Sequence, residues 1–134
     1  MRLIKFRGWD NIFAVDRFEK EFEKLTKEKA SKDPPDRYNS WLHNRCEKLD
    51  RDGKEAIDGF YFEDLKTTIT ADGEEFNLYS IRYSRSKLNP RVIFSIYEGQ
   101  TFILLYSFAE KSTNDYKKAI ALCKNRLKAI VEEE

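Results

Sequence analysis

The sequence predicts an α+β fold, a small antiparallel-dominated sheet with helices packed on one of its faces. The expected order of elements is a strand, two helices, four strands and a closing C-terminal helix. Short turn signals join most of the strands, so neighbours along the chain should pair as hairpins. The helical segments carry apolar residues at steps of three and four, which gives each helix one stripe to bury against the sheet.

All 134 residues should form one domain, because chains of roughly 100–200 residues usually do. Within residues 1–134, we expect an N-terminal strand and helical pair over 1–52, then the sheet and closing helix over 57–134. Hydrophobic residues make up 40% of the chain, which is enough for a single core.

The N-terminal part predicts one strand and a first helix. Apolar residues within 2–7 indicate the strand, and Asp10 or Asn11 should cap the helix that follows. From Ile12 the apolar residues change to a helical period. They are Val15, Phe18, Phe22 and Leu25.

A second helix should follow a proline break. The segment Asp33-Pro34-Pro35 should end the first helix by Lys32, since proline cannot continue a helix. The second helix is expected from Asp36 to the turn signal Asp52-Gly53. Its core-facing residues should be Tyr38, Trp41, Leu42, Cys46 and Leu49.

The sheet should occupy most of the second half. Residues 57–69 stay ambiguous, with loop or short strand over 59–62 and strand character over 65–70. Asp72-Gly73 is a hairpin signal that should pair 66–70 with 76–83.

Two further strands and a helix complete the prediction. The strands should run over 91–97 and 101–108, joined by the turn Glu98-Gly99-Gln100. The closing helix should begin near Thr113, with Thr113 or Asn114 as its cap. Its apolar stripe is the cleanest in the chain: Tyr116, Ile120, Cys123, Leu127 and Ile130.

Charge is divided unevenly along the chain. The net charge is only +1, but residues 76–131 hold 10 Lys or Arg against 3 Asp or Glu. Such a split indicates either a surface that faces a polyanion or two halves with ordinary solvated charge.

Arginines on the predicted strands are the main functional signal. Strand alternation and the connection over 84–90 should bring Arg82 and Arg91 close together on one face. Two like charges side by side destabilise a sheet, and a polyanionic ligand or an acidic partner would relieve that cost. The arginine fork matches phosphate oxygens, so these residues suggest a phosphate-binding surface.

RNA cleavage is the chemistry that this surface suggests. Arg82, Arg91 and Lys111 are the candidate catalytic cations, which would stabilise charge on the phosphorane. Arg85, Lys87 and Tyr106 are candidate RNA-binding residues, with the tyrosine able to stack on a base.

The general acid and base are not evident from the sequence. His43, Glu98 and Glu110 are possible, but each is also an ordinary packing, turn or cap residue. No metal constellation, glycine-rich phosphate loop or nucleophile elbow is present, so we expect no metal and no cofactor.

The remaining features favour a cytoplasmic protein. Cys46 and Cys123 are 77 positions apart and form no CxxC motif, so a zinc site is not expected. The longest apolar run is 102–106, far below the ~20 residues of a membrane span.

Four segments in order resemble the RelE/ParE/HigB superfamily of toxins, and more narrowly its phage-derived HigB-like branch. The segments are Leu78 to Arg82, Arg91 to Phe94, Ile103 to Lys111, and a helix with Ile120, Ala121 and Arg126. Arg82 and Arg91 match the two strand arginines of that pattern. Phe108 and Lys111 match the Phe and the second Lys of its Phe-x-Lys-Lys strand end.

The resemblance implies a small RelE-like sheet with packed helices and ribosome-dependent cleavage of mRNA. It also implies a cognate antitoxin, expected to be a helix-turn-helix protein, and no membrane partner. Two alternatives stay open, because one fold can serve several functions. One is a gyrase-poisoning, ParE-like toxin. The other is a non-catalytic phage or mobile-element protein that binds a protein partner.

Overall fold

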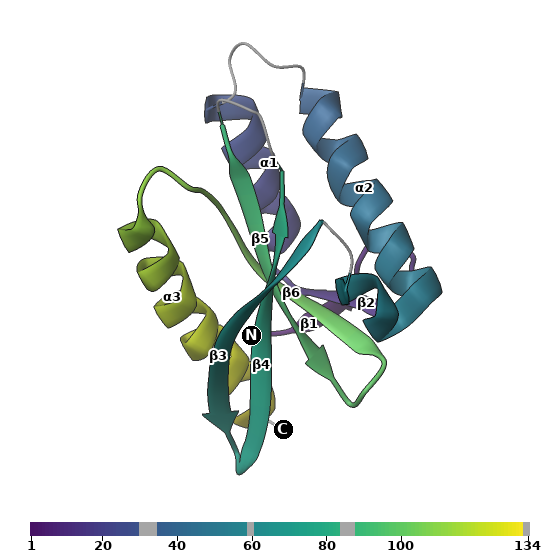
Figure 1. Cartoon of the computed structure of the whole chain (residues 1–134), viewed down its shortest axis with the longest axis vertical. Helices are drawn as coiled ribbons and strands as arrows, with labels where there is room; N and C mark the ends of the chain where they lie inside the picture. Colours follow the sequence, from purple (N-terminus) through teal and green to yellow (C-terminus); the bar gives the residue numbers. More distant parts are fainter. Residues whose placement is uncertain (30–34, 59–60, 84–87, 133–134) are drawn as a thin grey trace.

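The computed structural model describes residues 1–29, 35–58, 61–83 and 88–132 (Figure 1). Six strands form one sheet: β1 Leu3–Lys5, β2 Ile12–Val15, β3 Phe62–Ala71, β4 Glu74–Arg82, β5 Pro90–Tyr97 and β6 Thr101–Ala109. The helices are α1 Phe18–Lys29, α2 Pro35–Asp52, the short 3-10 helix η1 Gly53–Asp58, and α3 Thr113–Glu132. The chain is therefore α+β and has the expected C-terminal helix.

The sheet is mixed, with strand order β1-β2-β6-β5-β4-β3. Among the strands that the structure describes, the β2–β6 pair is parallel and the four other pairings are antiparallel. Both predicted hairpins are present. Asp72 and Gly73 have φ of 50° and 78°, as a two-residue hairpin turn requires. The β5–β6 connection has three residues, with φ of 51° at Glu98 and 81° at Gly99.

The predicted helix start at Ile12 is wrong, because Ile12–Val15 is strand β2. This strand lies between β1 and β6, and the helix begins only at Phe18. Asp10 and Asn11 therefore cap no helix. Instead, the Asn11 backbone N–H donates to the Asp50 carboxylate at 3.0 Å, which ties the start of β2 to α2.

The other boundaries are close to the predicted ones. Helix α2 ends at Asp52, and its five predicted core residues are all buried. The ambiguous stretch resolves into η1 and then β3, which begins at Phe62. Helix α1 ends at Lys29; the predicted break at Asp33-Pro34 lies outside the described residues.

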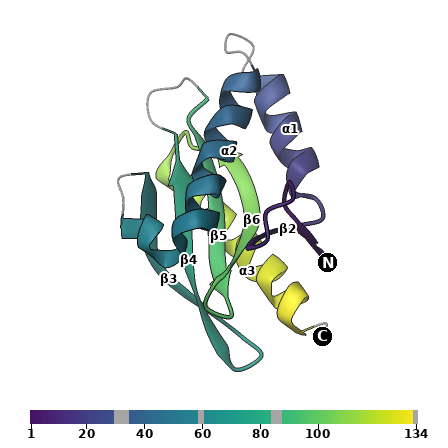
Figure 2. The same ribbon diagram turned by 90° about the vertical axis from the view of Figure 1, so that its right-hand side faces the viewer.

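The prediction that the helices share one face of the sheet is also wrong. On one face, Tyr38 and Trp41 of α2 pack against Tyr83. On the other, Tyr116 of α3 bonds to Ser80, whose side chain points away from that of Tyr83 because strand residues alternate. Helices α2 and α3 therefore sandwich the sheet (Figures 1 and 2). Helix α1 lies along β6.

Burial on both faces explains why β5 and β6 are almost continuously apolar. Residues 90–95 of β5 and 102–105 of β6 are buried without interruption. Among the helices that the structure describes, none is long and apolar enough to cross a membrane.

Candidate functional site

Strands β4 and β5 bring Arg82 and Arg91 directly opposite each other, as the sequence predicts. Each arginine has its own carboxylate. Arg82 Nη1 lies 3.5 Å from Glu63 Oε2, and Arg91 Nε lies 2.9 Å from Glu110 Oε2. The cost of placing two positive charges side by side is therefore relieved within the chain.

The two arginines differ in how they are held. Arg91 is only 5% exposed, and its Nη1 also donates to the carbonyl oxygens of Tyr83 and Pro90, at 3.2 and 3.0 Å. It thus joins the end of β4 to the start of β5. The Arg82 side chain is 48% exposed. Arg82 is therefore the more accessible cation of the pair.

A tyrosine that the sequence assigned to the core stripe completes this region. The Tyr116 hydroxyl, from the first turn of α3, shares a hydrogen bond of 3.0 Å with Ser80 Oγ. Burial raises the pKa of Tyr116, so its hydroxyl stays protonated at neutral pH. The charges of Arg91 and Glu110 also act on this hydroxyl. We call Ser80, Arg91, Glu110 and Tyr116 the α3-face cluster.

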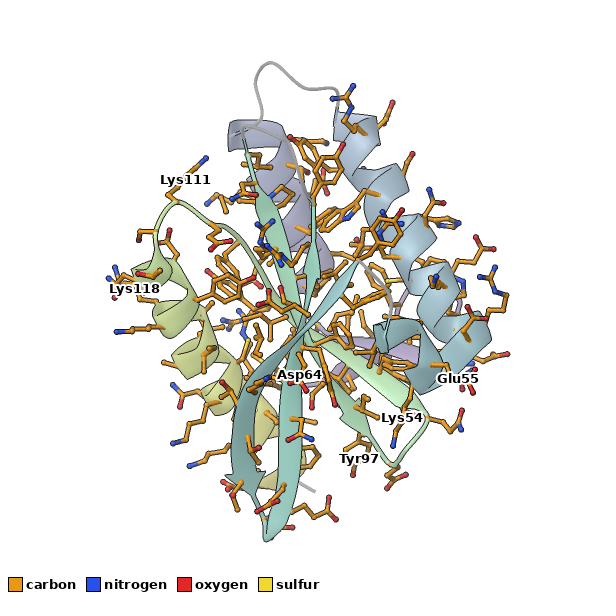
Figure 3. The ribbon with its side chains drawn as sticks, in the orientation of Figure 1. Lys54, Glu55, Asp64, Tyr97, Lys111 and Lys118 are labelled. Carbon is orange, nitrogen blue, oxygen red and sulfur yellow. The ribbon has the colours of Figure 1, made fainter. Side chains whose placement is uncertain are left out.

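A groove of about 710 Å³ adjoins this cluster, between α1, the end of β6 and the start of α3. We call it the α1–α3 groove. It is lined by two predicted site residues, Tyr106 and Lys111, and by two further lysines, Lys24 and Lys118. Figure 3 shows Lys111 extending outward from the segment after β6, and Lys118 from α3. The groove therefore combines a half-buried aromatic ring with three lysines.

Aromatic packing connects the groove to the α3-face cluster. Tyr106 stacks on Phe108 with ring centroids 6.0 Å apart, and Phe108 meets Tyr116 edge-on at 5.0 Å. Arg126 lies beneath the Tyr106 ring, 5.3 Å from its centroid, and pairs with Glu21 through an Nη1–Oε1 contact of 2.7 Å. Because that ion pair is neutral overall, the remaining charged residues of the groove lining are its three lysines and Asp115, which leave it positive.

The acidic residue Asp115 at the start of α3 also lines the groove and offsets part of the charge of those lysines. Its carboxylate accepts the backbone N–H groups of Lys111 and Ser112, at 2.7 and 2.9 Å. These bonds lower the pKa of Asp115 and cap the helix, a role that the sequence assigned to Thr113 or Asn114.

Other predicted residues lie elsewhere. Arg85 and Lys87 are outside the described residues. Glu98 is in the β5–β6 turn, at the opposite end of β5 from Arg91. The His43 ring packs on Trp9, with centroids 4.8 Å apart, on the outer side of α2. Glu110 is the one candidate base that lies beside the arginines.

Several members of the site could not be predicted from the sequence. Glu63 and Tyr116 reach the arginines only through strand register and helix docking, and Lys24 reaches the groove from α1. No metal-binding group of three or more His, Cys, Asp or Glu side chains occurs within residues 1–29, 35–58, 61–83 and 88–132.

Comparison with protein-family models finds none that matches the sequence, and a search of curated proteins finds no significant match.

Proposed function

We propose that this chain is the toxin of a type II toxin–antitoxin module, with a RelE/HigB-like fold, and that it cleaves mRNA on the ribosome. The observation that supports this most is the gathering of four predicted residues at one end of one sheet face. They are Arg82, Arg91, Tyr106 and Lys111. An RNA strand that follows the groove lysines would pass from Tyr106 toward the arginines.

The α3-face cluster offers the groups that RNA cleavage needs. Glu110 would accept the proton of the 2′-hydroxyl, and Tyr116, which stays protonated, would give a proton to the leaving oxygen. Arg82 and Lys111 would stabilise the charge of the phosphorane, with Arg91 orienting Glu110. This assignment needs no metal.

A second function, protein binding without catalysis, is favoured by the state of Arg91. Its Nε and Nη1 already bond to Glu110 and to two backbone carbonyls, so it has a complete structural role without RNA. A chain of that kind would keep the fold and bind a partner through the α1–α3 groove.

Inducible expression in a bacterial host distinguishes these functions. Growth and transcript 5′ ends would be measured for the wild type, Arg82→Ala, Lys111→Ala and the control Lys124→Ala. Lys124 is an exposed α3 lysine that does not line the groove. We expect growth arrest with new cuts in translated messages for the wild type and the control, and weaker cutting for the other two variants.

Other outcomes would identify the alternatives. A DNA-damage response without cut transcripts would indicate gyrase poisoning, and normal growth with intact transcripts would leave the binding role. The proposed antitoxin partner predicts a short neighbouring reading frame that encodes a helix-turn-helix protein.

A further inference from the structure

A second cavity lies on the α2 face of the sheet, between α2 and the adjoining ends of β3 and β4. Its volume is about 380 Å³, within the size range of small-molecule sites. Arg37, Trp41 and Arg45 line it from α2, at successive steps of four that place them on one side of the helix. Tyr61 and Tyr83 line it from the sheet. We call it the α2 cleft.

The charge of the α2 cleft has one sign. The charged residues that the structure describes in its lining are all arginines: Arg37, Arg45 and Arg82. Ser40 and Asn44 add neutral hydrogen-bonding groups from α2. Strand alternation puts the Arg82 side chain on the same face as Ser80, where it pairs with Glu63, so Arg82 borders the cleft at the end of β4 and the other two arginines come from α2.

Arg45 is the residue that points to a ligand. Its guanidinium carbon lies over the Tyr61 ring, 3.6 Å from the ring centre, in a cation–π contact. Its Nε is buried and has no hydrogen-bond acceptor among the residues that the structure describes. Burial lowers the pKa of Arg45, and no ion pair of Arg45 with a carboxylate occurs among the described side chains.

Aromatic side chains form the rest of the cleft. Trp41 donates its indole N–H to the Arg82 carbonyl at 3.3 Å, and its ring meets Tyr83 edge-on at 5.3 Å, so the floor is fixed. Tyr61 is one of the two large hydrophobic residues of the described chain that are exposed, at 42%. An exposed aromatic ring beside an arginine can stack on a nucleobase.

We infer that the α2 cleft binds a nucleotide unit, with its phosphate on Arg45 and Arg37 and its base against Tyr61. A planar guanidinium matches the oxygens of phosphate, and the negative charge of the phosphate would balance the positive charge of Arg45. The nucleotide is either free or part of a single strand of RNA. This site lies on the opposite sheet face from the α3-face cluster and does not depend on the proposed toxin activity.

Binding to the purified 134-residue chain would test the inference, with AMP, adenosine and an oligouridylate as probes and calorimetry as the readout. Arg45→Ala is the test variant, and Arg51→Ala is the matched control. Arg51 is an arginine of the same helix that is exposed and pairs with its neighbour Asp52. Arg45→Lys keeps the charge without the fork, and circular dichroism would show that each variant is folded.

We expect AMP or the oligouridylate to bind better than adenosine. Binding should fall about tenfold or more in Arg45→Ala, partly recover in Arg45→Lys, and be unchanged in Arg51→Ala. AMP binding would identify a free nucleotide as sufficient, whereas binding of the oligouridylate alone would identify RNA as the source. The inference is overturned if neither AMP nor the oligouridylate binds, or if Arg45→Ala and Arg51→Ala bind the probes equally well.

Discussion

At the scale of single residues, Arg91 illustrates how a predicted catalytic group can be held for a structural reason. Strand alternation was sufficient to place Arg91 beside Arg82, because both positions follow from local pairing. The carboxylate that neutralises it, Glu110, is 19 residues further along the chain, and no local pattern indicates that contact. Because Arg91 is buried, substituting it would change the stability of the protein as well as any activity.

We therefore predict that Arg91→Ala lowers the free energy of unfolding by about 2–3 kcal/mol, since it breaks a partly buried ion pair and removes one hydrogen bond from each of two carbonyls. Arg82→Ala should cost less than about 1 kcal/mol, because its ion pair with Glu63 is half exposed. Urea unfolding would measure both. Equal losses of unfolding free energy in the two variants would contradict a structural role for Arg91 that Arg82 does not share.

Tyr116 gives a sharper residue-scale test of catalysis. Tyr116→Phe keeps the ring that packs on Phe108 but removes the hydroxyl bonded to Ser80. We expect a stability loss of about 1 kcal/mol and a fall in RNA cleavage of roughly 10²–10⁴-fold, the usual contribution of a general acid. A variant that cleaves as fast as the wild type would remove Tyr116 from the mechanism.

At the scale of elements, hairpins and long helices could be predicted, and the placement of short elements could not. Asp72-Gly73 specifies its turn locally, and the α3 stripe is long enough to show its period. The four residues of β2 are too few to separate strand from helix, and their partner β6 lies about 90 residues away. The uninterrupted apolar run at 102–106 was the missed sign that both sheet faces are covered.

The start of α3 is an element whose stability should depend on pH. The bonds of Asp115 to two backbone N–H groups lower its pKa in the folded protein. The stability that these bonds contribute is therefore present above the pKa of Asp115 in the unfolded chain, and it is lost as pH falls through its pKa in the folded protein. Asp115→Asn should therefore lower the melting temperature at pH 7. The difference from the wild type should shrink toward pH 3. A difference that stays constant with pH would contradict the capping role.

Docking of α2 and α3 on opposite faces should protect both thiols. Cys46 of α2 and Cys123 of α3 are free and buried, and burial raises the pKa of each thiol. We expect neither to react with a thiol reagent at pH 8 in the native protein, and both to react after denaturation. Rapid labelling of Cys123 alone would indicate that α3 detaches from the sheet.

At the scale of the whole molecule, the sheet separates two surfaces of different chemistry. The α3 face holds the α3-face cluster beside a lysine-lined groove, and the α2 face holds an arginine and tyrosine cleft. Net charge alone would not predict either surface, because acidic residues elsewhere balance the basic ones to +1. The excess of basic residues in the second half of the chain indicated the surface on the α3 face. The α2 cleft, in contrast, depends on a contact between Arg45 of α2 and Tyr61 that only the fold creates.

The most direct test of the proposed activity is cleavage of a defined message by the purified chain, with and without translating ribosomes. We predict cuts only when ribosomes are present, with 5′-hydroxyl downstream ends, as expected when a 2′-hydroxyl attacks the phosphate. Lys111→Ala should cut weakly and Lys124→Ala should cut normally. An intact message in the presence of translating ribosomes and folded wild-type protein would contradict the proposal.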